Sequence, residues 1–121
     1  MARLVLVEDE QVNRDLFRRR LERRGYVVVP AENGLQAVEF TKREKPDLVI
    51  MDLGLPDIDG WEATRRIKAD PDLKSIPVIA VTSYALSGDE EKTRAAGCDG
   101  YIAKPYSPRQ MLAKVREILG A

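Results

Sequence analysis

Two short apolar runs in this sequence each end on carboxylates. The run at residues 4–7 is followed by Glu8 and Asp9, and the run at residues 48–51 is followed by Asp52. The carboxyl ends of parallel strands meet at one edge of an open α/β sheet, where such folds hold their ligands. Carboxylates that close repel one another, so the pocket favours a divalent cation, and Mg²⁺ takes oxygen ligands of this kind. The pattern predicts a magnesium site at which Asp52 attacks a phosphoryl group.

The same acids also have structural explanations that the residues alone leave open. Glu8 and Asp9 stand before a helix-period segment and could cap its first turn. Asp52 could cap a helix or a turn that leads into Pro56. Only the elements that carry these side chains can separate the two explanations.

Five apolar runs of strand length are spaced along the chain. Val, Ile and Leu dominate them without polar alternation, which is typical of parallel strands covered on both faces. The expected strands are residues 3–7, 26–29, 48–51, 78–81 and 101–103. Helix-period segments alternate with these runs, so the sequence predicts a doubly wound α/β fold around a five-stranded parallel sheet.

Five helices are expected with this sheet. They are residues 11–24, 35–43, 59–69 and 88–96, and a last helix around the apolar stripe at 111–119. The side of the first helix expected to be buried carries Val12, Leu16, Phe17 and Leu21. The fourth helix has few large apolar residues, and elements that move in a switch are drawn from such weakly packed segments.

Composition excludes several classes of protein. The chain has 121 residues, which suits one domain, and its 20 basic and 20 acidic side chains argue against a nucleic-acid partner. It has no histidine, so neither Ser-His-Asp catalysis nor an imidazole metal site can form within it. No apolar run approaches the roughly 18 residues of a membrane span, no signal peptide precedes the first strand, and the single Cys98 has no intrachain disulfide partner. We therefore expect a cytoplasmic protein without membrane contact.

Arginines gather in the first expected helix, at positions 18–20 and 23–24. Glu22 interrupts the cluster, which is typical of the solvated face of a helix. A patch that binds a phosphate backbone is the alternative interpretation.

Four strand ends together carry a set of residues that resembles a known family. The motifs are Glu8-Asp9, Met51-Asp52-Leu53-Gly54-Leu55-Pro56, Val81-Thr82-Ser83 and Tyr101-Ile102-Ala103-Lys104-Pro105. In this order they resemble the receiver domains of two-component response regulators, the CheY-like family, over essentially the whole chain. The resemblance implies the flavodoxin-like strand order 2-1-3-4-5. The stretch from Tyr84 to Tyr101 is similar to stand-alone DivK-type regulators and also to receivers attached to hybrid kinases.

The resemblance also implies the metal ligands and the phosphoacceptor. Asp52 would accept the phosphoryl group. Asp9, Asp52 and the backbone carbonyl of Gly54 would bind Mg²⁺, with Glu8 acting through a water molecule. Many relatives have aspartate where this chain has Glu8, and the longer side chain leaves direct and water-mediated contact both open.

Residues at the ends of the fourth and fifth strands would complete the site, and some of them would change position when Asp52 is phosphorylated. Lys104 would stabilise charge on the transferring phosphoryl group, and Thr82 would donate its hydroxyl to a phosphoryl oxygen. The switch would consist of Thr82, Tyr101 and Pro105, the last after a cis bond to Lys104. As Thr82 moves toward the phosphoryl group, Tyr101 would rotate inward. The surface read by a partner would then include Tyr84, Arg94, Tyr101, Tyr106 and Arg109.

Three alternatives compete with this interpretation. A phosphatase of the haloacid dehalogenase type also phosphorylates an aspartate after a strand, but it needs a second acid two residues on, where this chain has Gly54. A flavodoxin-like cofactor carrier would hold phosphate after the first strand, where Glu8 and Asp9 repel it. The chain could also be a receiver cut from a hybrid kinase or a larger regulator, although Met1 directly before the first strand favours an intact single-domain protein.

We therefore expect a single receiver domain over residues 1–121. It would take a phosphoryl group onto Asp52 from a histidine kinase or a histidine phosphotransfer protein and then bind a downstream protein. We expect a monomer or a weak, phosphorylation-dependent dimer. It would not be a turnover enzyme, because its chemistry ends with its own phosphorylation and dephosphorylation.

Overall fold

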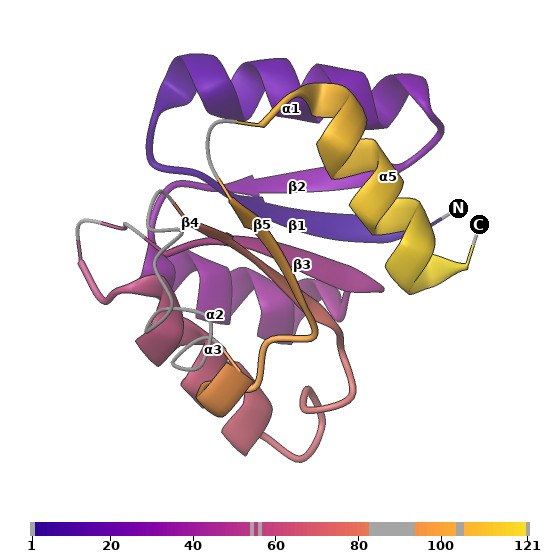
Figure 1. Cartoon of the computed structure of the whole chain (residues 1–121). Helices are drawn as coiled ribbons and strands as arrows, with labels where there is room; N and C mark the ends of the chain where they lie inside the picture. Colours follow the sequence, from indigo (N-terminus) through magenta and orange to yellow (C-terminus); the bar gives the residue numbers. More distant parts are fainter. Residues whose placement is uncertain (1, 54, 56, 83–93, 104–105, 121) are drawn as a thin grey trace.

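The computed structural model of the chain describes residues 2–53, 55, 57–82, 94–103 and 106–120. Strands and helices alternate along it (Figure 1). The strands are β1 (Arg3–Val7), β2 (Val27–Ala31), β3 (Leu48–Asp52), β4 (Val78–Thr82) and β5 (Gly100–Ala103). The helices are α1 (Gln11–Arg23), α2 (Gly34–Glu44), α3 (Gly60–Ala69) and α5 (Pro108–Leu119).

The five strands form one parallel sheet in the order β2-β1-β3-β4-β5. Helices α1 and α5 cover one face, and α2 and α3 cover the other (Figure 1). The predicted doubly wound α/β fold and its strand order are confirmed. In the register of β1 with β3, Val7 is paired with Met51. The residues that follow, Glu8 and Asp52, therefore leave the centre of the sheet side by side.

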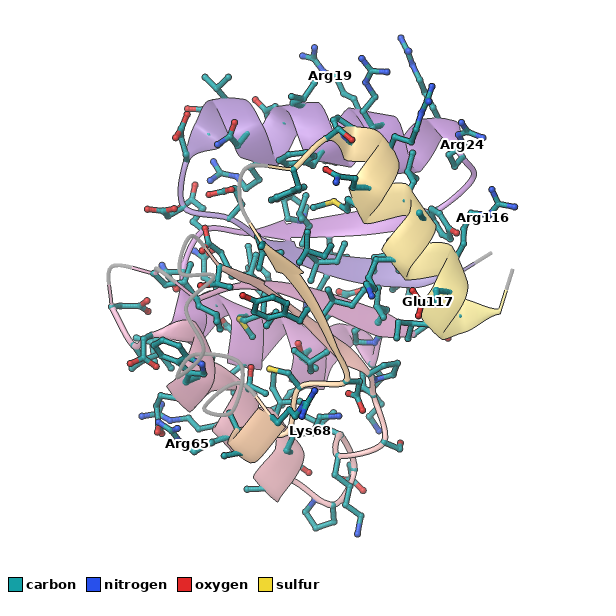
Figure 2. All side chains as sticks on the ribbon, in the orientation of Figure 1. Arg19, Arg24, Arg65, Lys68, Arg116 and Glu117 are labelled. Atoms are coloured by element: carbon teal, nitrogen blue, oxygen red, sulfur yellow. The ribbon has the colours of Figure 1, made fainter. Side chains whose placement is uncertain are left out.

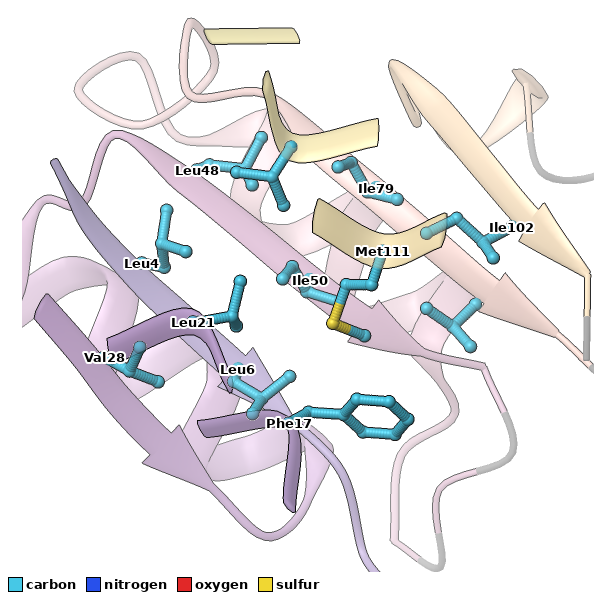
Figure 3. Packing of buried hydrophobic residues seen from close by; sticks show 12 residues of the cluster. Leu4, Leu6, Phe17, Leu21, Val28, Leu48, Ile50, Ile79, Ile102 and Met111 are labelled. Atoms are coloured by element: carbon cyan, nitrogen blue, oxygen red, sulfur yellow. The ribbon is translucent and has the colours of Figure 1, made fainter. Parts of the chain in front are cut away.

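Strand side chains alternate between two buried layers, one on each face. The layer under α1 and α5 includes Leu4, Leu6, Leu48, Ile50 and Ile79, with Phe17 and Met111 from the helices (Figure 3). The opposite layer includes Val5, Val7, Val49, Met51 and Val78, with Ala63 and Ile67 of α3. Because both faces of the sheet are buried, the central strands are apolar at consecutive positions rather than at every second one, with polar residues only at their ends.

The helix count differs from the expected five, because four complete helices lie among the described residues. The helix expected at residues 88–96 falls mostly on residues 88–93, which are outside the described part of the chain. Arg94 and Ala95 are helical. Within the described ranges, no helix has the length and apolarity that crossing a membrane requires.

The buried side of α1 differs from the predicted one. Arg14, Phe17 and Leu21 are buried, whereas Val12 is 72% exposed and Leu16 is 41% exposed. At 3.6 residues per turn, Val12 and Leu16 lie roughly opposite Arg14 on the helix. The prediction that these two residues belong to the core is wrong. The helix instead buries a mixed stripe in which an arginine replaces an apolar side chain.

Candidate functional site

Three carboxylates converge where β1 and β3 end, as the sequence predicted. Glu8, Asp9 and Asp52 each offer one oxygen, and these oxygens all lie within 4.8 Å of one another. Glu8 and Asp52 are buried, with 4% and 3% of their surfaces exposed, while Asp9 is open to solvent. We call this cluster the acidic pocket. Its geometry confines negative charge at the carboxyl edge of the sheet.

The loop after β1 is held by backbone contacts. The backbone N–H of Glu8 donates to the Ala31 carbonyl at 3.0 Å. Nη1 of the buried Arg14 donates to the carbonyl oxygens of Glu8 at 2.9 Å and Asp9 at 3.4 Å. A second guanidinium nitrogen of Arg14 lies 3.5 Å from the Glu32 carboxylate. Arg14 therefore ties the loop that carries two acids to the first helix.

The capping explanation of the first two acids does not describe this loop. The N-cap of α1 is Glu10, whose side chain makes no capping hydrogen bond. The Glu8 carboxylate accepts from the Glu10 backbone N–H at 3.1 Å, outside the helix. Asp9 extends into solvent beside the pocket.

Asp52 is fixed by the strand that carries it and by the helix that follows. It is the last residue of β3, and its backbone carbonyl faces the first turn of α3. A Cβ on Gly60 would lie 2.5 Å from this carbonyl oxygen and 2.7 Å from the Cα of Leu53, so only glycine fits there. The N-cap of α3 is Asp59, which accepts from the Glu62 backbone N–H at 2.8 Å. Asp52 is therefore not the cap of α3, and its carboxylate belongs to the acidic pocket.

The end of β4 lies beside this pocket. Asp52 is paired with Val81, and the Leu53 N–H donates to the Val81 carbonyl at 2.9 Å. Thr82, the next residue, is 1% exposed and is paired with Ala103 of β5. Thr82 is thus brought to the same edge as Asp52, as the sequence predicted.

The remaining predicted site residues are distributed over different surroundings. Tyr101 is half-buried on β5, Arg94 is exposed, and Arg109 is exposed at the start of α5. Arg109 faces the C-terminal end of α1 rather than the acidic pocket. Four predicted residues, Gly54, Tyr84, Lys104 and Pro105, lie outside the described residues.

Tyr106, expected on a partner surface, is a half-buried neighbour of the acidic pocket. Its ring stacks on Phe17 with 5.1 Å between centroids. Burial, together with the negative charges of Glu8 and Asp52, raises the pKa of Tyr106, so its hydroxyl keeps its proton. This side chain connects the pocket to the layer between α1 and α5.

Arg14 and Asp57 are positioning residues that the sequence analysis missed. A basic residue in an arginine-rich helix gives no signal that it is buried. Asp57 accepts from the backbone N–H groups of Gly34 at 2.8 Å and Leu35 at 2.9 Å, across the sheet edge. Burial opposes the charge on Asp57, but these and other backbone N–H bonds outweigh it and lower its pKa below the ordinary 3.8. Asp57 thus joins the loop after β3 to the start of α2.

Comparison with known proteins identifies this arrangement. The family model of the response regulator receiver domain matches residues 4–116. The chain belongs to this family. It is a receiver domain of two-component signalling, and the resemblance stated from its motifs is confirmed.

The receiver is similar in sequence to response regulators along almost their whole length. It is 42% identical over 117 residues to the polar-differentiation response regulator DivK of Brucella anthropi, covering 97% of this chain and 95% of that protein. DivK of Brucella ovis is 41% identical over the same length. Receivers of this kind are signalling proteins rather than turnover enzymes.

Solved structures of other receivers share the fold. The receiver domain of a sensor histidine kinase from Pseudomonas aeruginosa, described with a magnesium ion in its active-site cleft, aligns with a TM-score of 0.90 at 36% identity over 99% of this chain and 98% of its own. The chemotaxis protein CheY4 of Vibrio cholerae aligns with a TM-score of 0.93 at 24% identity over 98% and 99% of the two chains, which supports the fold alone.

Proposed function

We propose that this receiver is a single-domain, phosphorylation-dependent switch, residues 1–121, that acts in the cytoplasm. The observation that carries the proposal is the convergence of Glu8, Asp9 and Asp52 within 4.8 Å, beside the buried Thr82. Because these 121 residues include no histidine, the phosphohistidine donor lies outside them, in a histidine kinase or a phosphotransfer protein.

The acidic pocket suits Mg²⁺. Oxygen ligands about 2.1 Å from the ion span at most about 4.2 Å across an octahedron, close to the separation of these carboxylates. Asp9 and Asp52 would bind directly, together with the expected Gly54 carbonyl. Glu8, which already accepts from the Glu10 N–H, would act through water. When bound, the ion would neutralise charge on the transferring phosphoryl group.

The chemistry of the chain itself is a phosphoryl transfer. A carboxylate oxygen of Asp52 attacks phosphorus as the phosphorus–nitrogen bond of the donor breaks, and the electron pair of that bond returns to the donor imidazole. Thr82 donates its hydroxyl to a phosphoryl oxygen, and Lys104 supplies a positive charge. Water later hydrolyses the acyl phosphate and regenerates Asp52.

Two surfaces would serve the two steps of signalling. Val12 and Leu16 are exposed on α1, the helix that follows Asp9. A phosphodonor that approaches Asp52 would contact this helix. New charge on Asp52 would shift Thr82 and then Tyr101, changing the side that carries Arg94 for a downstream protein. Donor and target would therefore contact different elements.

Mass spectrometry after acetyl phosphate treatment tests this function. With Mg²⁺ we expect one phosphoryl adduct, which is lost on chelation and lost in Asp52→Asn. The matched control is Asp57→Asn, because Asp57 lies at the same edge but bonds to the start of α2. An adduct that survives Asp52→Asn, or that forms equally without metal, would contradict the proposal.

A further inference from the structure

A groove of about 630 Å³ lies between the C-terminal end of α1 and α5. Its lining includes residues directly before β1 and β2, so it is at the amino edge of the sheet, opposite the acidic pocket. On α1, the groove residue Arg20 lies nine residues after Gln11, a rise of about 13 Å along the helix from the end that follows the acidic pocket. This groove has no part in the phosphoryl chemistry proposed above.

Four arginines line the groove, namely Arg20, Arg24, Arg109 and Arg116, and among the described residues no acidic side chain does. We call it the arginine groove. Across the described part of the chain, none of the four forms an ion pair. Arg24 and Arg116 lie at the same end of the molecule, whereas Arg19 is on the outer side of α1 (Figure 2). A chain without net charge therefore concentrates positive charge in one concave place.

Helix electrostatics account for only part of this cluster. Arg20 and Arg116 stand in the last turns of α1 and α5, where a cation is favourable next to the helix C-terminus. Arg109 is the second residue of α5, where the positive end of the helix disfavours it. The first turn of α5 has no acidic residue to offset this repulsion. An anion seated in the groove would offset it.

We propose that the arginine groove binds an organic phosphate of nucleotide size. Guanidinium groups match phosphate oxygens in a two-pronged geometry. The half-buried Tyr26 and Leu112 provide an apolar lining for the ring of such a ligand. The volume lies within the range of small-molecule sites, whereas a stable protein partner needs on the order of 1,000 Å² of interface. Charge and size together favour a small amphipathic anion over an acidic protein.

Isothermal titration calorimetry without divalent cations tests the proposal. We expect ATP to bind with a dissociation constant below about 1 mM, more tightly than AMP or pyrophosphate, and adenosine not to bind. Arg20→Gln with Arg109→Gln should weaken ATP binding at least about tenfold. The control pair Arg19→Gln with Arg65→Gln removes the same charge outside the groove and should leave affinity within about twofold.

Several results would overturn it. These are no ATP binding at 5 mM (about five times the limit above), equal weakening by both pairs of substitutions, pyrophosphate binding as tightly as ATP, or a glutamate-rich peptide binding more tightly. Thermal unfolding adds a second readout. Without ligand, Arg109→Gln should keep or raise the midpoint, because it removes repulsion, and a lowered midpoint would assign Arg109 a structural role. ATP should also bind Asp52→Asn as it binds the wild type, so this proposal and the phosphoryl switch can fail separately.

Discussion

The acidic pocket and the arginine groove lie at opposite edges of the same sheet and are built from different parts of it. The pocket takes its charges from strand ends, and two of its three acids are buried. The groove takes its charges from long, exposed side chains on two helices. The acidic pocket is therefore built into the core, whereas the arginine groove is formed by side chains on the surface of the core.

This difference determines how each site responds to substitution. Around the pocket, backbone atoms and buried side chains fix the acids, so changes there should alter the free energy of unfolding as well as ligand binding. In the groove, single side chains can be replaced without disturbing the packing beneath them. The following predictions test the pocket side of the comparison, from the largest effect to the smallest.

Gly60→Ala should have the largest effect. The added methyl group would meet the Asp52 carbonyl oxygen at 2.5 Å, which neither backbone segment can relieve. We expect a loss of about 3 kcal/mol in the free energy of unfolding, measured in urea. The control is Gly120→Ala, where a positive φ of 76° is strained but no atom lies within 4 Å, with a loss of about 1 kcal/mol. Similar losses in both variants would show that α3 does not restrain Asp52.

Arg14→Met should come next. It removes the hydrogen bonds to the Glu8 and Asp9 carbonyls and leaves these groups unpaired, a loss of about 2 kcal/mol. The stabilisation by Mg²⁺ should fall as well, because the acid-bearing loop is no longer held. Arg19→Met, an exposed position on the same helix, is the control and should change stability by less than about 0.5 kcal/mol. If Arg14→Met lowered stability but left the stabilisation by Mg²⁺ unchanged, Arg14 would support the fold without positioning the acids for the metal.

Asp57→Ala removes an acid that lies at the same edge of the sheet as the acidic pocket but accepts hydrogen bonds from backbone N–H groups. Loss of its bonds to Gly34 and Leu35 should cost about 1 kcal/mol at pH 7, a modest value because water screens an exposed carboxylate. The pKa of Asp57 is lowered in the folded state, so its contribution is present above the ordinary 3.8 and is lost as pH falls through the lower folded value. Urea unfolding should therefore show wild type and variant converging below about pH 4. Asp15→Ala is the control, and a constant difference across pH would contradict the charged contact.

Asp9→Asn should have the smallest effect and the opposite sign. Without metal, removing one of three crowded charges should leave stability unchanged or raise it by about 0.5 kcal/mol. With Mg²⁺, the wild type should gain stability and the variant much less. Thermal unfolding in EDTA and in Mg²⁺ measures both. A variant that is less stable in EDTA would show that Asp9 supports the fold rather than the ion.

The sequence predicted the acidic pocket because strand ends and their order place Glu8, Asp9 and Asp52 at one edge without any knowledge of side-chain packing. Arg14 could not be predicted, because nothing in an arginine-rich helix distinguishes a buried guanidinium from solvated ones. The same limit applies to the groove, whose arginines come from helices at opposite ends of the chain. Sites at strand ends can be predicted from local sequence patterns, whereas sites between helices depend on tertiary contacts that these patterns do not show.

The bounds of β2 differ from the predicted ones. The second was predicted at residues 26–29 and lies at Val27–Ala31, continuing through Pro30. A proline lacks the N–H that a central strand needs, but β2 is at the edge of the sheet, where this loss is tolerated. Val12 and Leu16 are exposed although they are apolar, because apolar character alone does not determine which side of a helix packs against the core.

The glycine that begins α3 has a consequence for the proposed signalling. Since no atom can be added between Gly60 and the Asp52 carbonyl, α3 packs tightly against one flank of the proposed phosphoacceptor. In the function proposed above, phosphorylation of Asp52 would therefore be accommodated toward the other flank, where Thr82 ends β4 and Tyr101 lies on β5. The structural response of the receiver to phosphorylation would thus be directed toward β4 and β5 even without a bound partner.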